Sequence, residues 1–205
     1  MEPFVRHVGR VVVLQRDNVD TDQIIPKQFL KSIVRTGLGP ALFYDWRYLS
    51  DGKTPNPEFE LNRPAARGAS ILVAGANFGC GSSREHAAWA LADAGFRAIL
   101  ASSFADIFFA NCCQNGLLPV RLEAQEVEEL QRRSEAAAEG YSLTIDLQEQ
   151  LVEDGHGFRT RFELDPYRRE MLLRGIDEIG RTLLDEPRIA AFERKRAQQA
   201  AVPAT

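Results

Sequence analysis

The spacing of hydrophobic positions predicts a regular alternation of strands and helices through the middle of the chain. Short runs of apolar, often β-branched residues predict strands at 7–14, 70–74, 97–101 and 117–122. Amphipathic stretches predict helices at 83–94, 104–113 and 124–139, with Gly95 as a stop signal after the first of them. Because strands that alternate with helices usually pair in parallel, this pattern indicates βαβ units.

The pattern changes after about residue 140. Two strand-like segments follow, and Asp154-Gly155 is a turn signal inside the second of them. After these segments the apolar spacing becomes helical and remains so almost to the end of the sequence. The predicted strands lie at 141–147 and 150–164, and the predicted helices at 167–174, 176–184 and 187–199.

The segments between the first two strands predict loops that contain short helices. Residues 17–22 are polar and predict a loop, and 24–34 predict a loop that runs into a short helix. Residues 37–64 combine several prolines with a group of aromatic side chains, which indicates an ordered excursion rather than a linker. The aromatic residues of this excursion are Phe43, Tyr44, Trp46 and Tyr48.

Composition favours one compact domain. The chain has 205 residues, of which 44% are hydrophobic, so it can bury a sizeable core. We predict a single domain over 1–205 of the α/β class, with three layers in the order β/β/α and a helical C-terminal tail. Its core covers about 1–140, with a candidate active-site loop at 75–86, and a strand-plus-helix extension covers 141–205.

Charge and hydropathy exclude several classes of partner. The formal net charge is -4 and acidic and basic residues are interspersed, so the basic surface of a nucleic-acid-binding protein is not expected. No apolar run approaches the roughly 20 residues that a membrane-spanning helix needs. The run at 11–14 is too short for the core of a signal peptide. We therefore expect a cytoplasmic protein that binds neither nucleic acid nor membranes.

The three cysteines do not form a metal-binding pattern. Cys112 and Cys113 are adjacent, Cys80 lies far upstream, and there is no CxxC pair. An odd and sparse set of cysteines argues against a disulfide framework. Neither a zinc site nor an iron–sulfur cluster fits this spacing without ligands from another chain. We therefore expect no metal or cofactor site on this chain.

The loop at 75–86 is the strongest candidate for an anion-binding site. Gly79 and Gly81 allow a close backbone approach to a ligand, and a helix is predicted directly after them. Ser82 and Glu85 have the spacing of a capping box, which predicts the helix start, and the free N–H groups there attract anions. Arg84 adds a planar guanidinium suited to a carboxylate or phosphate. The alternative is a plain structural cap, while Walker A and dinucleotide fingerprints do not match.

Four ordered motifs resemble those of the aconitase superfamily. They are NVDTDQIIP at 18–26, FGCGSSREHA at 78–87, SFADIF at 103–108 and NGLLPV at 115–120. In size and motif order the chain resembles the small subunits of 3-isopropylmalate dehydratase, and the match runs from about His7 into the tail. The resemblance implies the swivelling-domain fold of this superfamily.

The resemblance also implies a reaction. In this family 2-isopropylmalate is converted to 3-isopropylmalate through 2-isopropylmaleate, by dehydration and rehydration, in leucine biosynthesis. The small subunit is active only with a large subunit, which carries a [4Fe-4S] cluster whose labile iron binds the leaving hydroxyl. The expected substrate is therefore a small dicarboxylic hydroxy acid, and the expected partner is the large subunit.

Residue roles follow from the same resemblance. It implies that Ser82 is the catalytic base and that Ser83 and Arg84 bind a substrate carboxylate. Asp22 matches a family position near the active site, and Arg35 is a candidate for a second carboxylate contact. The segment 26–31 corresponds to the family's specificity loop. The full set of implied site residues is Ser82, Ser83, Arg84, Asp22, Arg35, Phe29 and Leu30, with Gly79 and Gly81 in the anion loop.

The sequence leaves alternative interpretations open for several residues. Asp22 alternatively belongs to a local Asx-type turn, and Arg35 alternatively is an ordinary surface arginine. His86 favours a supporting or packing role over acid catalysis. The helix after Glu123 is expected to cover its own sheet, with docking of a partner as the alternative. For the whole chain, the alternatives are the small subunit of a sibling hydro-lyase such as homoaconitase, and a non-catalytic anion-binding module on the same fold.

Overall fold

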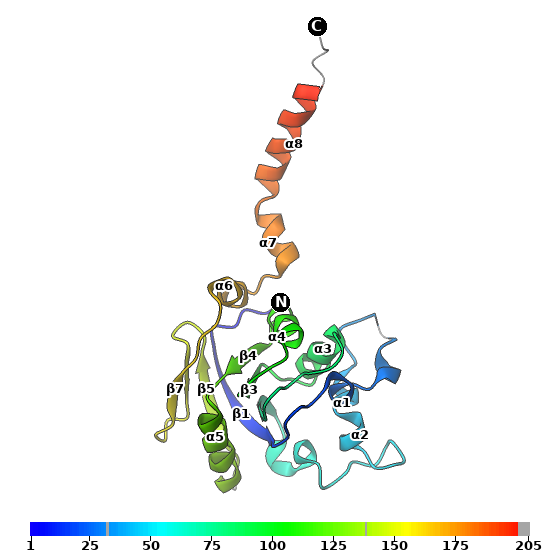
Figure 1. Cartoon of the computed structure of the whole chain (residues 1–205), viewed down its shortest axis with the longest axis vertical. Coiled ribbons are helices and arrows are strands. Elements are labelled where there is room, and N and C mark those ends of the chain that lie inside the picture. Colours follow the sequence, from blue (N-terminus) through cyan, green and yellow to red (C-terminus); the bar gives the residue numbers. More distant parts are fainter. Residues whose placement is uncertain (32, 138, 201–205) are drawn as a thin grey trace.

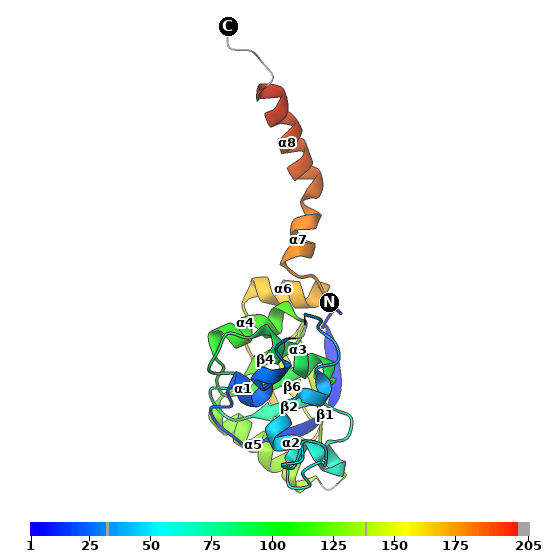
Figure 2. The ribbon, with the colours of Figure 1, turned by 90° about the vertical axis from the view of Figure 1, so that its right-hand side faces the viewer.

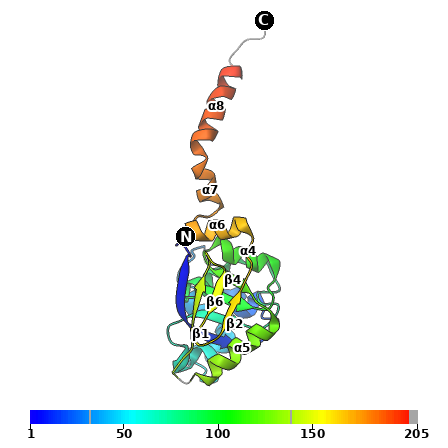
Figure 3. The same ribbon diagram turned by 90° about the vertical axis from the view of Figure 1, so that its left-hand side faces the viewer.

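The molecule is built on one seven-stranded mixed sheet with the strand order β4-β3-β2-β1-β5-β6-β7. The computed structural model describes residues 1–31, 33–137 and 139–200, with side chains described up to residue 197. Figures 1, 2 and 3 show a compact body, in which helices pack around the sheet, and two C-terminal helices that lead away from it.

Half of the sheet is parallel, as the strand–helix alternation predicts. The parallel strands are β1 (Arg6–Leu14), β2 (Ala69–Ala74), β3 (Ala98–Ala101) and β4 (Leu118–Arg121). All four residues of β3 are buried, as expected for a strand covered on both faces. The carboxyl ends of these strands lie at the same edge of the sheet, so the loops that follow them come together there.

The other half of the sheet is antiparallel and comes from the C-terminal part of the chain. Strand β5 (Ser142–Asp146) pairs with β1, and β6 (Leu151–Glu153) and β7 (Arg159–Arg161) form a hairpin beside it. The predicted turn is present: the Asp154 carboxylate accepts hydrogen bonds from the backbone N–H groups of His156, at 2.7 Å, and Phe158, at 2.9 Å. The division of the chain at about residue 140 stays a prediction, although strands from both sides of it share one sheet.

The two faces of the sheet carry separate hydrophobic cores. On β1, Val12 and Leu14 join one core, together with the apolar face of α3 (Glu85–Asp93) and the excursion. Val11 points to the opposite face and joins the second core with α5 (Ala124–Ala136) and the antiparallel strands. The expected α/β class with layered packing is confirmed, and α5 covers its own sheet by contacts with β1, β2 and β3.

The excursion at 37–64 is ordered by its aromatic residues, as predicted. Phe43 is fully buried, stacks on Trp46 at a ring distance of 5.8 Å and meets Phe59 edge-on at 5.9 Å. The Arg16 guanidinium lies 4.2 Å from the Trp46 ring. The short helices before β2 are α1 (Thr21–Ile24), α2 (Tyr44–Arg47) and 3₁₀ turns at Lys27–Phe29, Gly39–Ala41, Glu60–Asn62 and Pro64–Ala66.

The predicted start of α3 is wrong by two residues, and the predicted capping box is not formed. The helix begins at Glu85, and the N-cap residue Arg84 is extended and makes no side-chain cap hydrogen bond. The helix starts after Arg84, so Ser82 is not the N-cap residue; the Thr21 hydroxyl holds the Ser82 carbonyl at 2.9 Å, and the Glu85 carboxylate instead accepts a hydrogen bond from Asn115 at 2.9 Å.

Capping boxes that the sequence analysis did not predict form at two other helices. One joins Asp20 and Gln23 at α1, within the segment predicted to be a polar loop, and the other joins Glu123 and Glu126 at α5. Helix α5 ends at Ala136, before the predicted end at 139, and residue 138 lies outside the described residues.

The C-terminal helices occur where the apolar pattern predicts them. Helix α4 (Asp106–Gln114) packs against α6 (Pro166–Arg174), and α7 (Glu178–Leu184) and α8 (Glu186–Ala200) follow. Figures 1 and 2 show α7 and α8 in orange and red, extending away from the body beyond α6. None of the helices in the described part of the chain combines the length and the apolar character needed to cross a membrane.

Candidate functional site

The loop between β2 and α3 is held on both sides by loops that follow the neighbouring parallel strands. Gly79 donates its N–H to the Val19 carbonyl at 2.7 Å, and the Cys80 carbonyl accepts the N–H of Thr21 at 2.9 Å. On the other side, Phe78 donates to the Ser103 carbonyl at 3.0 Å. The backbone of this loop is therefore fixed before any ligand is present.

Gly79 and Gly81 are required by backbone conformation. Gly79 has φ = +77°, and a Cβ atom on it would lie 2.1 Å from Cγ of Phe108, so no side chain fits. Gly81 has φ = +87°, and a Cβ atom added there would lie 3.4 Å from Cβ of Asp20. Both glycines favour the left-handed region and let the chain turn into α3. This supports the expected geometry of the loop, while its role as an anion loop stays a prediction.

Ser82 and Ser83 lie on the open surface directly before the helix. Both residues are exposed, and within the described part of the chain neither hydroxyl takes part in a hydrogen bond. Thr21, which is buried, fixes the peptide after Ser82 through its hydroxyl. Sequence reasoning missed Thr21, although it lies inside the first of the four motifs. The two serine hydroxyls are thus placed by the backbone and remain available to a ligand.

Arg84 and Asp22 are brought together as an ion pair across the two loops. The Arg84 guanidinium donates a hydrogen bond to the Asp22 carboxylate, with side chains 19% and 51% exposed, respectively. The Asx-type alternative applies to Asp20 instead, whose carboxylate caps α1 by accepting from the Gln23 N–H at 2.7 Å. Asp22 therefore faces Arg84 and the start of α3.

A second polar cluster lies just inside the start of α3. The Glu85 carboxylate accepts hydrogen bonds from Nδ2 of Asn115 at 2.9 Å and from Nε1 of Trp89 at 3.3 Å. The same indole N–H lies 3.0 Å from Oδ1 of Asn115. His86 packs its ring 4.6 Å from the Trp89 ring, in line with a supporting role. Sequence reasoning missed this cluster, although Asn115 opens the fourth motif.

Arg35 approaches the same helix start from an exposed segment. Its Nη2 lies 3.9 Å from Oε1 of Glu85, and its guanidinium carbon lies 5.5 Å from the Trp89 ring centre. The side chain is 61% exposed. Arg35 is therefore near the residues predicted to bind the substrate, and its contact with a carboxylate stays a prediction.

Phe29 and Leu30 are half-buried rather than freely exposed. Both pack against the core beneath the excursion, and the Phe29 ring lies 5.0 Å from the Tyr44 ring. This packing connects the predicted specificity segment to the aromatic excursion. Contact of either residue with a substrate side chain stays a prediction.

The cysteines have the environment of packed thiols. Cys112 and Cys113 are buried in the core, and burial raises the pKa of the Cys113 thiol to about 12. Burial, and then the nearby Asp20 carboxylate, raise the pKa of the Cys80 thiol, whose sulfur lies 3.4 Å from the Asn18 carbonyl. Among the described residues, no group of three or more His, Cys, Asp or Glu side chains is arranged to hold a metal ion.

Together these residues form an open polar surface in which two arginines are paired with the carboxylates of Asp22 and Glu85. The first N–H groups of α3, the Arg84 guanidinium and two free hydroxyls converge where the helix dipole is positive. Because the serines are exposed, water reaches them freely. Electrostatic stabilisation of a reacting anion is strongest where water is excluded, and these residues alone do not exclude it.

Comparison with known protein families gives matches along most of the chain. The model of the aconitase C-terminal domain matches residues 1–125, and a model described as LeuD_N matches 128–166. The model of the C-terminal domain of the 3-isopropylmalate dehydratase small subunit matches 178–200. These three matches follow one another without overlap, so body and tail both have counterparts.

Curated relatives are similar along nearly the whole chain. The 3-isopropylmalate dehydratase small subunit of Anoxybacillus flavithermus is 62% identical over 96% of this chain and 100% of its own length. That of Rhodopirellula baltica is 58% identical, with 96% and 100% covered. The crystal structure of 3-isopropylmalate dehydratase (leuD) from Methanocaldococcus jannaschii has a TM-score of 0.63 and 26% identity, and covers 92% of this chain and 99% of that one.

The four sequence motifs, the fold and the curated relatives all indicate the same protein family. The chain belongs to the family of 3-isopropylmalate dehydratase small subunits, within the aconitase superfamily.

Proposed function

We propose that this chain is the substrate-binding subunit of a 3-isopropylmalate dehydratase, a hydro-lyase. It converts 2-isopropylmalate to 3-isopropylmalate through 2-isopropylmaleate, in leucine biosynthesis, and acts together with a large subunit. The observation that carries the proposal is the pair of exposed serine hydroxyls beside Arg84 at the start of α3, held on a fixed glycine loop. Such a surface suits a small dianion.

Ser82 is the proposed base. The reaction removes a proton from a carbon next to a carboxylate, so negative charge increases on that carboxylate as the proton leaves. A serine hydroxyl is too weak an acid to serve as a base unless positive groups stabilise its alkoxide. The start of α3 and the Arg84 guanidinium supply this charge, and the Ser82 hydroxyl has no competing hydrogen-bond partner among the described residues.

Ser83, Arg84 and Arg35 are the proposed carboxylate-binding residues. A guanidinium binds a carboxylate through two parallel N–H groups, which also orients the plane of the carboxylate. In the unliganded chain the Arg84 guanidinium is paired with Asp22 and the Arg35 guanidinium lies near Glu85. The substrate's two carboxylates would replace or join these internal carboxylates. Until the substrate binds, Asp22 keeps the Arg84 guanidinium oriented.

The large subunit is proposed to complete the site. The relatives are named small subunits, and the described cysteines and carboxylates of this chain do not fit a cluster. We therefore assign the [4Fe-4S] cluster of the family to the large subunit. The exposure of Ser82 and Ser83 supports the same arrangement, because a covering surface is needed to exclude water from the reacting carboxylate.

Phe29 and Leu30 are proposed to set the preference for a branched apolar substituent. Apolar pockets discriminate modestly, by about 1–3 kcal/mol per methylene group. Phe29 is anchored by its contact with Tyr44, so the segment that carries both residues has a defined position.

Reconstitution tests this function. The purified chain is mixed with its cognate large subunit, loaded with cluster under anaerobic conditions, and turnover is followed with 2-isopropylmalate, with homocitrate-type acids and with citrate as controls. We expect turnover only when both subunits are present, and a clear preference for 2-isopropylmalate. Full activity of the chain without the large subunit, or a pair that prefers a control acid, would contradict the proposal.

A further inference from the structure

The helices α7 and α8, residues 178–200, form an arm that has almost no cover from the rest of the molecule. Every residue from 181 to 197 is exposed, apart from the half-buried Ala190. Figures 1 and 3 show the arm continuing away from α6 and from the sheet. Helices of this length are marginal in water unless an apolar face is packed, so an arm of this kind indicates a missing partner.

The arm exposes large apolar side chains on more than one side. Ile189 and Phe192, 42% and 66% exposed, line a groove of about 760 Å³ between the arm and Tyr167. A second set of exposed apolar residues does not line that groove. It consists of Ile179, Leu183 and Leu184, which are 72%, 60% and 54% exposed.

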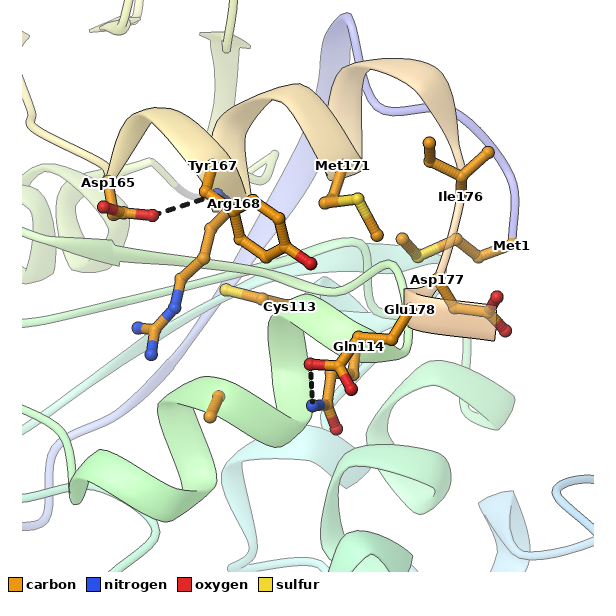
Figure 4. A pocket seen from close by; sticks show the side chains of 11 residues that line it. Met1, Cys113, Gln114, Asp165, Tyr167, Arg168, Met171, Ile176, Asp177 and Glu178 are labelled. Atoms are coloured by element: carbon orange, nitrogen blue, oxygen red, sulfur yellow. Dashed lines mark hydrogen bonds between the residues drawn. The ribbon is translucent and has the colours of Figure 1, made fainter. Parts of the chain in front are cut away.

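A cavity at the base of the arm, which we call the root cavity, adjoins the groove. This cavity, of about 540 Å³, lies between α4 and α6 and shares Tyr167 and Glu178 with the groove. Figure 4 shows the side chains of Met1, Met171 and Ile176 around it. Met1 and Met171 are the only methionines in the sequence, and methionine adapts its shape to a bound apolar group.

The base of the arm is anchored, so the arm has a defined direction. Nε2 of Gln114 donates to the Glu178 carboxylate at 3.3 Å, and the Asp177 carboxylate caps α7 by accepting the Gly180 N–H at 2.7 Å. The Arg181 guanidinium lies 4.7 Å from the Tyr167 ring. A partner would therefore meet a preformed surface made of the root cavity, the groove and the arm.

We infer that the arm and the root cavity are the docking element for the large subunit. This inference rests on the part of the proposed function that pairs the chain with that subunit. The exposed apolar residues of α7 lie outside the groove and those of α8 line it, so the apolar surface changes side along the arm, whereas two arms paired side by side would need one continuous stripe along both helices. An arm with two apolar sides fits a groove in a larger body.

Two further observations favour the large subunit as the occupant. The family model that covers residues 178–200 is described as a domain of small subunits, so the arm occurs in chains whose names imply a large-subunit partner. The candidate site also needs a second surface, because Ser82 and Ser83 are exposed. A partner that binds the arm would stay attached to this chain while it covers the candidate site.

The test measures binding of the full-length chain to its cognate, cluster-loaded large subunit by biolayer interferometry. Phe192→Ala and Leu183→Ala delete one apolar group each from the two sides of the arm, and Glu193→Ala is the matched control. Alanine preserves helix propensity, and circular dichroism checks the helix content. We expect each apolar variant to weaken binding roughly tenfold or more, as hot-spot residues do, and the control to change it less than about twofold.

Unchanged affinity of both apolar variants, or absence of binding by the unmodified chain, would overturn the inference. Sedimentation velocity of the isolated chain examines the rival occupant: a dimer that Phe192→Ala dissociates, with large-subunit binding intact, would assign the arm to a second copy and also overturn it. Failure of the proposed function looks different. In that case the pair would bind through the arm without turning over 2-isopropylmalate.

Discussion

The loop at 75–84 and the segment at 31–37 both bring an arginine to the start of α3, but they are held very differently. The loop is bonded on two sides, by backbone hydrogen bonds to Val19 and Thr21 and to Ser103. In the other segment, the described residues 31 and 33–37 are all exposed, and Ile33 is 93% exposed. Arg84 therefore belongs to a loop whose backbone is bonded on both sides, whereas Arg35 approaches the start of α3 from an exposed position.

Under the proposed function, this difference suits the two regions to different tasks. A base needs a preorganised electrostatic environment, and such an environment requires a fixed backbone. Recognition of the substrate's second carboxylate and its side chain tolerates a segment that adjusts to the ligand and to the partner. The pair between Arg35 and Glu85 is exposed, and such pairs contribute about 0–1 kcal/mol, so it is easily exchanged for a substrate carboxylate.

The largest expected effect is on the fixed side of the comparison. Ser82→Ala removes the proposed base and should lower kcat of the reconstituted enzyme by roughly 10²–10⁴-fold, the range for a general base. Ser83→Ala, which removes a neighbouring hydroxyl from the same exposed position, is the matched variant and should act mainly on KM. Equal losses of kcat in both variants would show that the two hydroxyls are not distinguished.

Glycine substitutions compare the two backbones directly. Gly79→Ala introduces a Cβ that would lie 2.1 Å from the Phe108 ring at positive φ, and should lower the free energy of unfolding by about 2–4 kcal/mol. Gly37 also has positive φ, but its Cβ would meet nothing within 4 Å, so Gly37→Ala should cost only about 1 kcal/mol. Chemical denaturation measures both. A cost for Gly37→Ala as large as that for Gly79→Ala would remove the contrast.

Lysine substitutions compare the two guanidiniums. Arg84→Lys keeps the charge but loses the planar fork, and should raise KM about tenfold while the subunits still associate. Arg35→Lys should raise KM by about threefold or less, since Arg35 makes a longer and more exposed contact. Steady-state kinetics of the reconstituted enzyme gives both values. The reverse order would place the stronger carboxylate contact on the exposed segment.

The smallest effect is expected inside the helix start. Asn115→Ala removes one hydrogen bond to the Glu85 carboxylate, which retains the Trp89 indole and is partly exposed to water. We expect kcat/KM to fall about threefold, because a bond to a solvated group contributes little. Asn115→Asp, which would place a second carboxylate beside Glu85, should cost more. An Asn115→Ala enzyme that loses most of its kcat would make this cluster part of the chemistry.

Much of the fold follows from local patterns. The order of strands and helices and the ordered excursion around Phe43 are confirmed, because each depends on apolar spacing or on aromatic packing nearby in the chain. The predicted capping box between Ser82 and Glu85 is wrong because residues distant in sequence shape the helix start: Thr21 holds the Ser82 backbone carbonyl, the helix begins only at Glu85, and Asn115 binds the Glu85 carboxylate.

The roles of the candidate site residues stay predictions, and their contacts with one another could not be predicted from the sequence. The order of the motifs indicated Asp22, Ser82 and Arg84 as candidate site residues. In the structure, Asp22 and Arg84 form an ion pair. The ion pair itself spans two loops that only the sheet brings together, so spacing along the chain carries no signal for it. Asn115 lay inside a motif without any feature that marked its contact with Glu85.

The most direct test of the central claim is a structure of the reconstituted pair of subunits with 2-isopropylmalate bound to the slow Ser82→Ala variant. We predict one substrate carboxylate within hydrogen-bond distance of Arg84 and the first N–H groups of α3, with the substrate carbon that loses its proton next to residue 82. A bound substrate that lies away from residues 82–84, with the start of α3 still open to solvent, would contradict this prediction.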